Sequence, residues 1–167
     1  MEVRRTQEKD VDIIMDIYSR ARKFMAKNGN LTQWPNSYPN IELVKSDVEK
    51  DGYVVIENEQ VIGVFVLEEN ANEPAYNTIE GAWLNDKPYS AIHRCATGGT
   101  VKGVGQFLLD WCFNKCDNIR VDTHEDNIPM KNLLNKNGYK YCGKVYYTAK
   151  DYGEDYGERI AFQKCKE

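Results

Sequence analysis

The feature that most constrains the fold of this chain is a glycine-rich turn between an expected strand and an expected helix. The sequence TVKGVGQFLLDWC, residues 100–112, places Gly103 and Gly105 two positions apart and then continues with apolar residues at helical spacing. An expected strand, YSAIHRCAT, precedes the turn, and a second, NIRVDTH, follows the helix. Strands that alternate with helices in this way are typical of an α/β domain.

The remaining elements continue this mixture of helices and strands. Apolar residues recur every three or four positions from Asp10 to Asn28, which predicts an amphipathic helix that ends at Gly29. The runs GYVVIE and VIGVFVLEE, separated by NEQ, predict a hairpin. The other expected elements are a strand VRRTQ, a loop LTQWPNSYPN, a short helix IELVKSDVEK, a polar loop over 70–88, a helix NIPMKNLLNKN, and two strands, YKYCGKVYYTAK and RIAFQKC, around a polar connection. We see no repeat and no linker, and expect one domain over residues 1–167.

Composition argues against several classes of protein. The 167 residues carry a formal charge of −4 with scattered lysines and arginines, so nucleic acid is not an expected partner. No apolar run approaches the ~20 residues of a membrane span, and none follows the N-terminal arginines, so we expect a cytoplasmic protein without membrane contact. The five cysteines form no Cys-x-x-Cys pair and the two histidines lie far apart, so no disulfide framework and no metal site are expected.

The glycine segment matches neither of two familiar phosphate motifs. Gly98 and Gly103 have the spacing of a P-loop, but the Lys and Ser/Thr that must follow are absent. Leu108 stands where a dinucleotide fingerprint needs its third glycine. A helix that starts near Gly103 would still present free N–H groups to an anion, with Lys102 as an added charge. The alternative is that the glycines only make a turn.

With its surroundings, the segment resembles the GNAT family of N-acetyltransferases. The family pattern Gln/Arg-x-x-Gly-x-Gly/Ala is matched by Thr100-Val101-Lys102-Gly103-Val104-Gly105. The pattern Asn-x-x-Ala-x-x-Leu-Tyr-x-Lys-x-Gly-Phe is matched by Asn127, Leu133, Lys136, Gly138 and Tyr139. The resemblance covers nearly the whole chain and implies a mixed, mostly antiparallel central sheet of about six or seven strands, flanked by about four helices, with the fourth and fifth strands splayed.

The resemblance implies acetyl-coenzyme A as the cofactor. Its pyrophosphate would lie on main-chain N–H groups of the glycine loop, and its pantetheine arm would run along the strand before that loop and enter the gap between the splayed strands. The residues that the resemblance assigns to the cofactor are Cys95, Ala96, Thr100, Val101, Lys102, Gly103, Val104, Gly105, Gln106, Asn127, Lys131 and Asn132.

Two positions depart from the family pattern. Thr100 replaces the usual Gln or Arg, and since the family binds through main-chain atoms there, cofactor binding should survive. Leu134 replaces the tyrosine that commonly protonates the departing thiolate, and leucine has no proton to donate. Another group then acts as the acid, the thiolate leaves unassisted, or catalysis has been lost.

The proton acceptor is open between several residues. Acetyl transfer needs a neutral amine, so a base must remove a proton, and in the family a backbone N–H of the fourth strand, here near Cys95, stabilises the oxyanion. His93 is one candidate for the base, and strand alternation predicts that either it or Arg94 faces the substrate, but not both. Asp122 and His124 are expected at the end of the fifth strand, and Tyr147 could supply a phenol. Each of these residues could instead have a purely structural role.

The acceptor site is expected to include the loop between the first two helices, where the family often contacts its substrate. The candidate residues are Gln33, Trp34 and Tyr38, with Glu80 on the approach to the fourth strand, although Trp34 could equally fill the core. The sequence therefore predicts an N-acetyltransferase that acts on a small amine, an amino acid or a peptide N-terminus, and that could form a homodimer. The alternatives are a catalytically silent coenzyme A-binding domain of the same fold and an unrelated nucleotide-binding protein.

Overall fold

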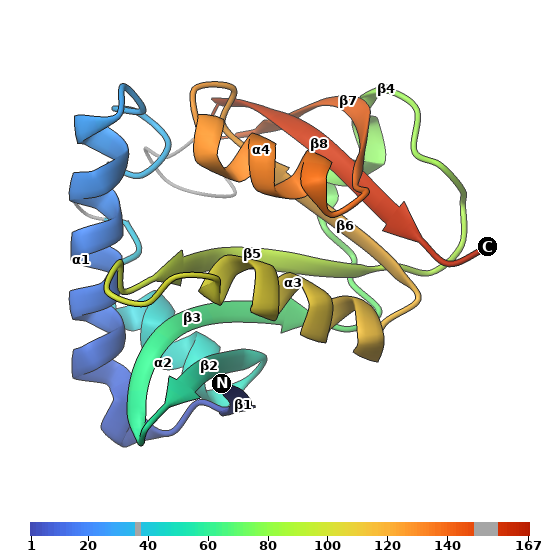
Figure 1. Cartoon of the computed structure of the whole chain (residues 1–167). Helices are drawn as coiled ribbons and strands as arrows, with labels where there is room; N and C mark the ends of the chain where they lie inside the picture. Colours follow the sequence, from blue (N-terminus) through green and yellow to red (C-terminus); the bar gives the residue numbers. More distant parts are fainter. Residues whose placement is uncertain (36–37, 149–156) are drawn as a thin grey trace.

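The computed structural model describes residues 1–35, 38–148 and 157–167, which form an eight-stranded mixed sheet with helices on both faces (Figure 1). The strand order is β1-β2-β3-β5-β6-β8-β7-β4. The strands are β1 (Glu2–Arg5), β2 (Gly52–Glu57), β3 (Gln60–Glu68), β4 (Glu80–Gly81), β5 (Ser90–Thr97), β6 (Asn118–Thr123), β7 (Lys140–Tyr147) and β8 (Gly157–Cys165). The α-helices are α1 (Val11–Lys27), α2 (Ile41–Glu49), α3 (Val104–Lys115) and α4 (Ile128–Lys136), and η1 (Glu8–Asp10) and η2 (Pro74–Thr78) are short 3-10 helices.

The predicted fold class is confirmed, with a somewhat higher number of strands. The additional strand is the two-residue β4, which pairs with β7 inside the segment that we expected to be a loop, and η2 lies in that segment too. Residues 36–37 of the predicted loop after α1, and residues 149–156, which include the connection expected before the last strand, lie outside the described residues.

The pairing of β5 with β6 positions the site. These strands are parallel and their register covers only Ser90↔Ile119, Ala91↔Arg120 and Ile92↔Val121. The described part of β6 makes no further ladder contact with β5, so the two strands diverge after Ile92, as the resemblance implied. All other described strand pairs are antiparallel.

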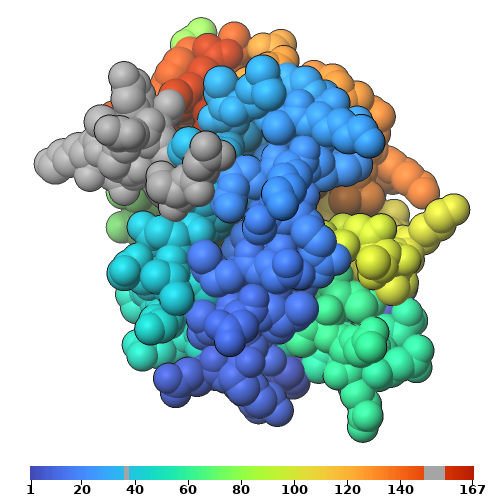
Figure 2. All heavy atoms as spheres, turned by 90° about the vertical axis from the view of Figure 1, so that its left-hand side faces the viewer, coloured from blue at the N-terminus to red at the C-terminus, as the bar shows by residue number. Residues whose placement is uncertain are grey.

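The two faces of the sheet carry different layers. α3 and α4 pack on one face through Leu108, Leu109 and Leu134, which join a large core cluster with side chains from β2, β3, β5, β6 and β8. α1 and α2 pack on the other face of β2, β3 and β5. Figure 2, which faces α1, shows this helix crossing the molecule between α2 and the glycine loop.

A bulge in β5 breaks the regular alternation of its side chains. Arg94 has a φ of 45°, and the register with β3 shifts between Val64 and Val66. Such a bulge adds a residue on one strand and redirects the side chains around it. His93 and Arg94 consequently contribute to the wall of the same cavity, although regular alternation along the strand would place them on opposite faces; which of them faces a substrate stays a prediction.

Candidate active site

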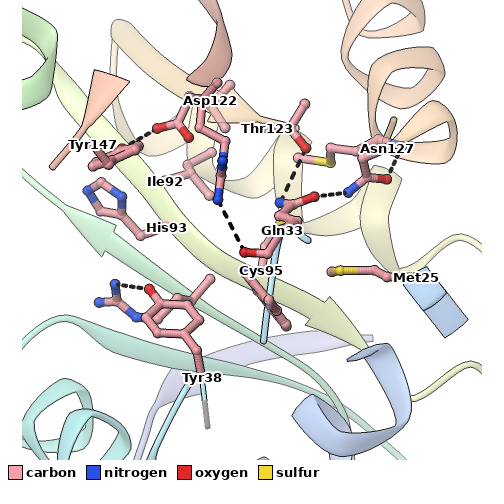
Figure 3. A pocket seen from close by; sticks show the side chains of 15 residues that line it. Met25, Gln33, Tyr38, Ile92, His93, Cys95, Asp122, Thr123, Asn127 and Tyr147 are labelled. Carbon is pink, nitrogen blue, oxygen red and sulfur yellow. Dashed lines mark hydrogen bonds between the residues drawn. The ribbon is translucent and has the colours of Figure 1, made fainter. Parts of the chain in front are cut away.

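Two cavities meet at the point where β5 and β6 diverge. We call the first the polar cavity; its volume is about 100 Å³, and it is lined by Met25, Gln33, Trp34, Tyr38, Ile92, His93, Arg94, Cys95, Val121, Asp122, Thr123, Asn127, Met130, Tyr147 and Arg159 (Figure 3). We call the second the apolar groove; its volume is about 320 Å³, and it is lined by Arg20, Ala21, Phe24, Met25, Cys95, Ala96, Thr97, Gly98, Gly99, Gly105, Leu108, Leu109, Asn127, Pro129, Met130 and Leu133. Met25, Cys95, Asn127 and Met130 belong to both walls.

The glycine loop forms one end of the apolar groove. Gly103 is the N-cap of α3 with a φ of 80°, which favours glycine, and the N–H of Phe107 bonds its carbonyl at 3.0 Å. The helix therefore starts without a side-chain cap, and its first N–H groups are available to an anion. Arg20 of α1 holds the loop from outside, because its Nη1 donates to the carbonyl of Gly98 at 2.6 Å.

Gly105 has a different role from Gly103. A Cβ at this position would lie 2.8 Å from Cδ2 of Leu133, well inside normal contact distance. The missing side chain therefore lets α3 approach α4 and leaves Leu133 in its place on the groove wall. Sequence reasoning assigned Gly105 to cofactor contact and did not find this packing role.

Four of the twelve expected cofactor residues line the apolar groove, namely Cys95, Ala96, Gly105 and Asn127. The other eight, Thr100, Val101, Lys102, Gly103, Val104, Gln106, Lys131 and Asn132, are not among its lining residues. The side chain of Val104 is buried in the core, Gln106 bonds Asn137, and Lys131 donates to the carbonyl of Glu125 at 3.2 Å.

The groove also has walls that sequence reasoning missed. Ala21, Phe24 and Met25 come from α1, and Pro129, Met130 and Leu133 come from α4. Their apolar spacing predicted helices but could not tell a groove wall from a packed core. Leu134 is fully buried in the core, so the position where the family has its tyrosine does not line either cavity.

Asn127 joins the two cavities through hydrogen bonds. Its Oδ1 accepts from the N–H of Met130 at 3.2 Å and so caps α4, and its Nδ2 donates to Oε1 of Gln33 at 3.0 Å. Nε2 of Gln33 in turn lies 3.5 Å from Oγ1 of Thr123. The structure thus brings two predicted residues, Gln33 and Asn127, into direct contact across the site.

His93 lies in the polar cavity beside a carboxylate. Its Nε2 is 3.5 Å from Oε2 of Glu68 on β3, and its side chain is largely buried. This contact lowers the pKa of Glu68, against the opposing effect of burial. Figure 3 shows the imidazole between Tyr147 and Tyr38, on the side of the cavity opposite Gln33.

Asp122 accepts hydrogen bonds from two phenols. The hydroxyl of Tyr76 donates to its Oδ2 at 2.7 Å, and the hydroxyl of Tyr147 donates to the same oxygen. Burial, and then the charge of Asp122, raise the pKa of Tyr76 well above its usual value. Both expected residues, Asp122 and Tyr147, are therefore at the site, and Tyr76, contributed by η2, was not expected there.

A buried ion pair supports the bulge of β5. Nη2 and Nε of Arg94 lie 2.7 Å from the two carboxylate oxygens of Asp47 on α2, and both side chains are largely buried. Nη1 of Arg94 is 3.4 Å from the hydroxyl of Tyr38. Trp34 makes edge contacts with Tyr18 and Tyr38, so it both fills the core and lines the cavity.

Two predicted residues lie away from the site. Neither His124 nor Glu80 lines a cavity wall. Nδ1 of His124 accepts from the N–H of Asp126 at 3.1 Å and its Nε2 lies 3.2 Å from the hydroxyl of Thr32, so His124 orders the turn before α4. Burial and the nearby charge of Arg159 lower the pKa of His124. Glu80 is exposed on β4, where it accepts from Tyr146 at 2.8 Å.

Cys95 stands where the two cavities join. Burial raises the pKa of its thiol to about 11, so it is a neutral thiol at neutral pH. A thiol that is not ionised is a poor nucleophile, so its chemistry fits a wall residue. Within the described residues there is no group of three or more side chains that could hold a metal ion, and no helix long and apolar enough to span a membrane.

Comparison with known proteins identifies the family. A GNAT-family acetyltransferase from Streptococcus agalactiae is 33% identical in sequence, with a TM-score of 0.85 over 99% of this chain and 95% of the other. The chain therefore belongs to the GNAT family. No family model and no curated protein sequence matches it.

More distant structures share the fold. A ribosomal-protein-alanine N-acetyltransferase from Brucella melitensis is 15% identical with a TM-score of 0.68, over 99% of this chain and all of the other. A GNAT-like decarboxylase in complex with isobutyryl-CoA is 12% identical with a TM-score of 0.68, over 99% of both chains. The fold thus serves acyl transfer and other chemistry, and the site must decide which one applies to this chain.

Proposed function

We propose that this protein is an acetyl-coenzyme A-dependent N-acetyltransferase that transfers the acetyl group directly to a primary amine. The observation that carries the proposal is the junction of the two cavities at Cys95 and Asn127. An acyl donor in the apolar groove and an amine in the polar cavity would meet at this junction, whose other shared wall residues are Met25 and Met130.

The residues of the apolar groove fit the chemistry of coenzyme A. The uncapped start of α3 offers N–H groups for the pyrophosphate, and the apolar walls from α1 and α4 suit the pantetheine arm. When bound, the cofactor supplies an activated acetyl group. Beyond Ile92, β5 has no ladder partner on β6, so the main chain around Cys95 can donate to the developing oxyanion.

His93 is the proton acceptor in this proposal. It is the histidine that lines the polar cavity, while both ring nitrogens of His124 contact neighbouring residues outside it. A neutral imidazole can accept a proton on one of its ring nitrogens, as a general base must. The acceptor would arrive as an ammonium and give one proton to His93. Its nitrogen would then form the C–N bond to the acetyl carbon as the C–S bond of the thioester breaks, and the second proton lost by the nitrogen would go to the thiolate.

In this proposal Tyr147 contributes to the binding site of the amine and does not contact acetyl-coenzyme A. It lines the polar cavity but not the groove, and its hydroxyl donates to Asp122. Its proton is therefore engaged by Asp122, and we propose that the thiolate would leave without a side-chain acid. Replacing Tyr147 by Phe should raise the KM for the amine several-fold and change kcat little. If the turnover rate instead fell by about 100-fold or more, the loss typical of a missing general acid, Tyr147 would be the acid.

Turnover of acetyl-coenzyme A by a panel of amines, amino acids and short peptides tests the proposal. We expect thiol release with at least one acceptor, and His93→Gln should lower kcat/KM by about 100-fold or more, the typical contribution of a general base. His124→Gln is the matched control, because it removes the chain's other histidine outside the cavities, and it should lower kcat/KM far less than His93→Gln does, although His124 orders the turn before α4. Binding of acetyl-coenzyme A without turnover of any acceptor would favour the alternative, a silent coenzyme A-binding domain, which Leu134 motivates.

A further inference from the structure

We propose that Glu68 is the positioning residue for His93, holding the proton on Nε2 of the imidazole so that Nδ1 faces the amine with its lone pair. The inference rests on the proposed function, because it assigns a partner to the base of that reaction. Glu68 itself lies behind His93 and is not among the residues that line either cavity.

The contact follows from the register of β3 and β5. Val66 lies opposite His93, and Glu68 lies opposite Ala91, so Glu68 and His93 are diagonal neighbours on one face of an antiparallel pair. Long side chains bridge such a diagonal, and Oε2 of Glu68 is 3.5 Å from Nε2 of His93. A carboxylate only accepts hydrogen bonds, so this contact favours the tautomer in which the nitrogen facing it carries the proton.

The other nitrogen of the ring is available to the substrate. No hydrogen bond joins Nδ1 of His93 to any residue within 1–35, 38–148 and 157–167. A histidine whose one nitrogen donates to a carboxylate has a fixed tautomer and a fixed ring orientation, and its other nitrogen becomes a better base. Nδ1 of His93 can therefore accept a proton without a change in the tautomer or the orientation of the ring.

Glu68 is distinguished by charge among the groups that face His93. Within the described residues it is the carboxylate within 4.0 Å of the imidazole. The other titratable or charged groups around the cavity, among the described residues, are Asp47 on α2, Arg94 and Cys95 on β5, Tyr76 on η2, Asp122 on β6, Tyr147 on β7, Arg159 on β8, and Tyr18 and Tyr38 beside the bulge. Asp47 already pairs with Arg94, and Asp122 accepts from phenols, so neither compensates an imidazolium as closely as Glu68 does.

The proton balance of the step is simple. An N–H bond of the substrate ammonium breaks, its electron pair remains on the amine nitrogen, and a new N–H bond forms on Nδ1 of His93. The resulting imidazolium is stabilised by the negative charge of Glu68. The half-exposed carboxylate is partly screened by water, so its stabilisation of the imidazolium should be moderate.

NMR spectroscopy of the imidazole nitrogens in the full-length, ¹⁵N-labelled protein tests the inference without turnover. In a His124→Gln background His93 is the remaining histidine, and its ¹⁵N shifts should show the tautomer with the proton on Nε2. Glu68→Gln should reduce the share of the tautomer with the proton on Nε2, because an amide can present either its oxygen or its NH₂ group to the ring. Glu69→Gln is the matched control, because the neighbouring carboxylate pairs with Lys115 at 3.1 Å instead, and it should leave the tautomer ratio unchanged.

Kinetics give a second readout. In Glu68→Gln turnover should slow by about 10-fold while the KM for acetyl-coenzyme A stays constant. A proton on Nδ1 in the wild type, or equal tautomer ratios in the two glutamine variants, overturns the inference alone. If the NMR result is as expected but the protein acetylates no amine, the proposed function is refuted, and so is the role of Glu68 in catalysis.

Discussion

Substitution of Gly105 by Ala should weaken binding of coenzyme A without unfolding the protein. The new Cβ would lie 2.8 Å from Cδ2 of Leu133, whereas ordinary contacts begin at 3.4 Å, so the leucine must withdraw by at least about 0.6 Å. A shift of rotamer costs about 0.5–1.5 kcal/mol, and alanine in place of helical glycine returns about 0.5–1 kcal/mol. The net stability should change by less than about 1 kcal/mol, or about 2–4 °C in Tm for a chain of this size.

The effect on the groove should be larger than the effect on stability. Leu133 lines the apolar groove, so its displacement narrows the space for the pantetheine arm. We expect a Kd for coenzyme A about 10-fold higher, equivalent to about 1.4 kcal/mol. Isothermal titration calorimetry with coenzyme A and acetyl-coenzyme A, together with thermal unfolding of the free protein, separates the two effects.

A double-mutant cycle identifies the cause. Leu133→Ala alone should weaken binding modestly by removing a wall contact, and in that background Gly105→Ala should cost almost nothing, because the clashing methyl group is gone. Full affinity of the single Gly105→Ala variant would refute the reasoning. The reasoning would also be refuted if Gly105→Ala reduced the affinity for coenzyme A equally in the wild type and in the Leu133→Ala background.

Three further predictions concern stability. The hydrogen bond from Arg4 lowers the pKa of Asp10. The carboxylate therefore stabilises the fold above about pH 4, and this contribution is lost as the pH falls through the lowered pKa. Asp10→Asn should reduce the urea midpoint at pH 7, and the midpoint of this variant should decline less steeply in acid. Asp47→Asn should cost about 3 kcal/mol, measured by urea unfolding, because it leaves the charge of Arg94 buried without its partner. Gly103→Ala should cost about 1–2 kcal/mol for the φ of 80°, and an unchanged urea midpoint would show that the loop relaxes freely.

Local patterns in the sequence predicted the parts of the fold that local interactions determine. The apolar spacing after Gly105 predicted α3, and the valine-rich runs predicted the hairpin of β2 and β3. In contrast, β4 has two residues, too few for any periodicity, and it exists because the chain around Glu80 meets the edge of β7. Pairing of this kind depends on distant strands and leaves no signal in the segment itself.

The site was predicted less completely than the fold because its walls come from separate layers. The resemblance pointed to the end of β5 and to Asn127, which do border the groove, but it gave no hint that α1 closes the other side with Phe24 and Met25. Both residues belong to an amphipathic stripe whose other members face the core. Likewise, Tyr76 comes from a segment without regular pattern, and only the tertiary fold brings its hydroxyl to Asp122.

The bulge at Arg94 connects these observations. A positive φ at an arginine costs free energy of the order of 1–3 kcal/mol. Neither the arginine nor its neighbours in the sequence predict this conformation. The conformation is held from outside by the hydroxyl of Tyr18, which donates to the carbonyl of Arg94 at 2.9 Å, and by the ion pair with Asp47. Because the bulge lets His93 and Arg94 share one cavity wall with Cys95, the layer of α1 and α2 sets the geometry of the site as well as covering the sheet. The shape of the cavity wall at β5 therefore depends on contacts from the layer of α1 and α2, and a variant that removes the bond from Tyr18 or the pair with Asp47 should change this wall.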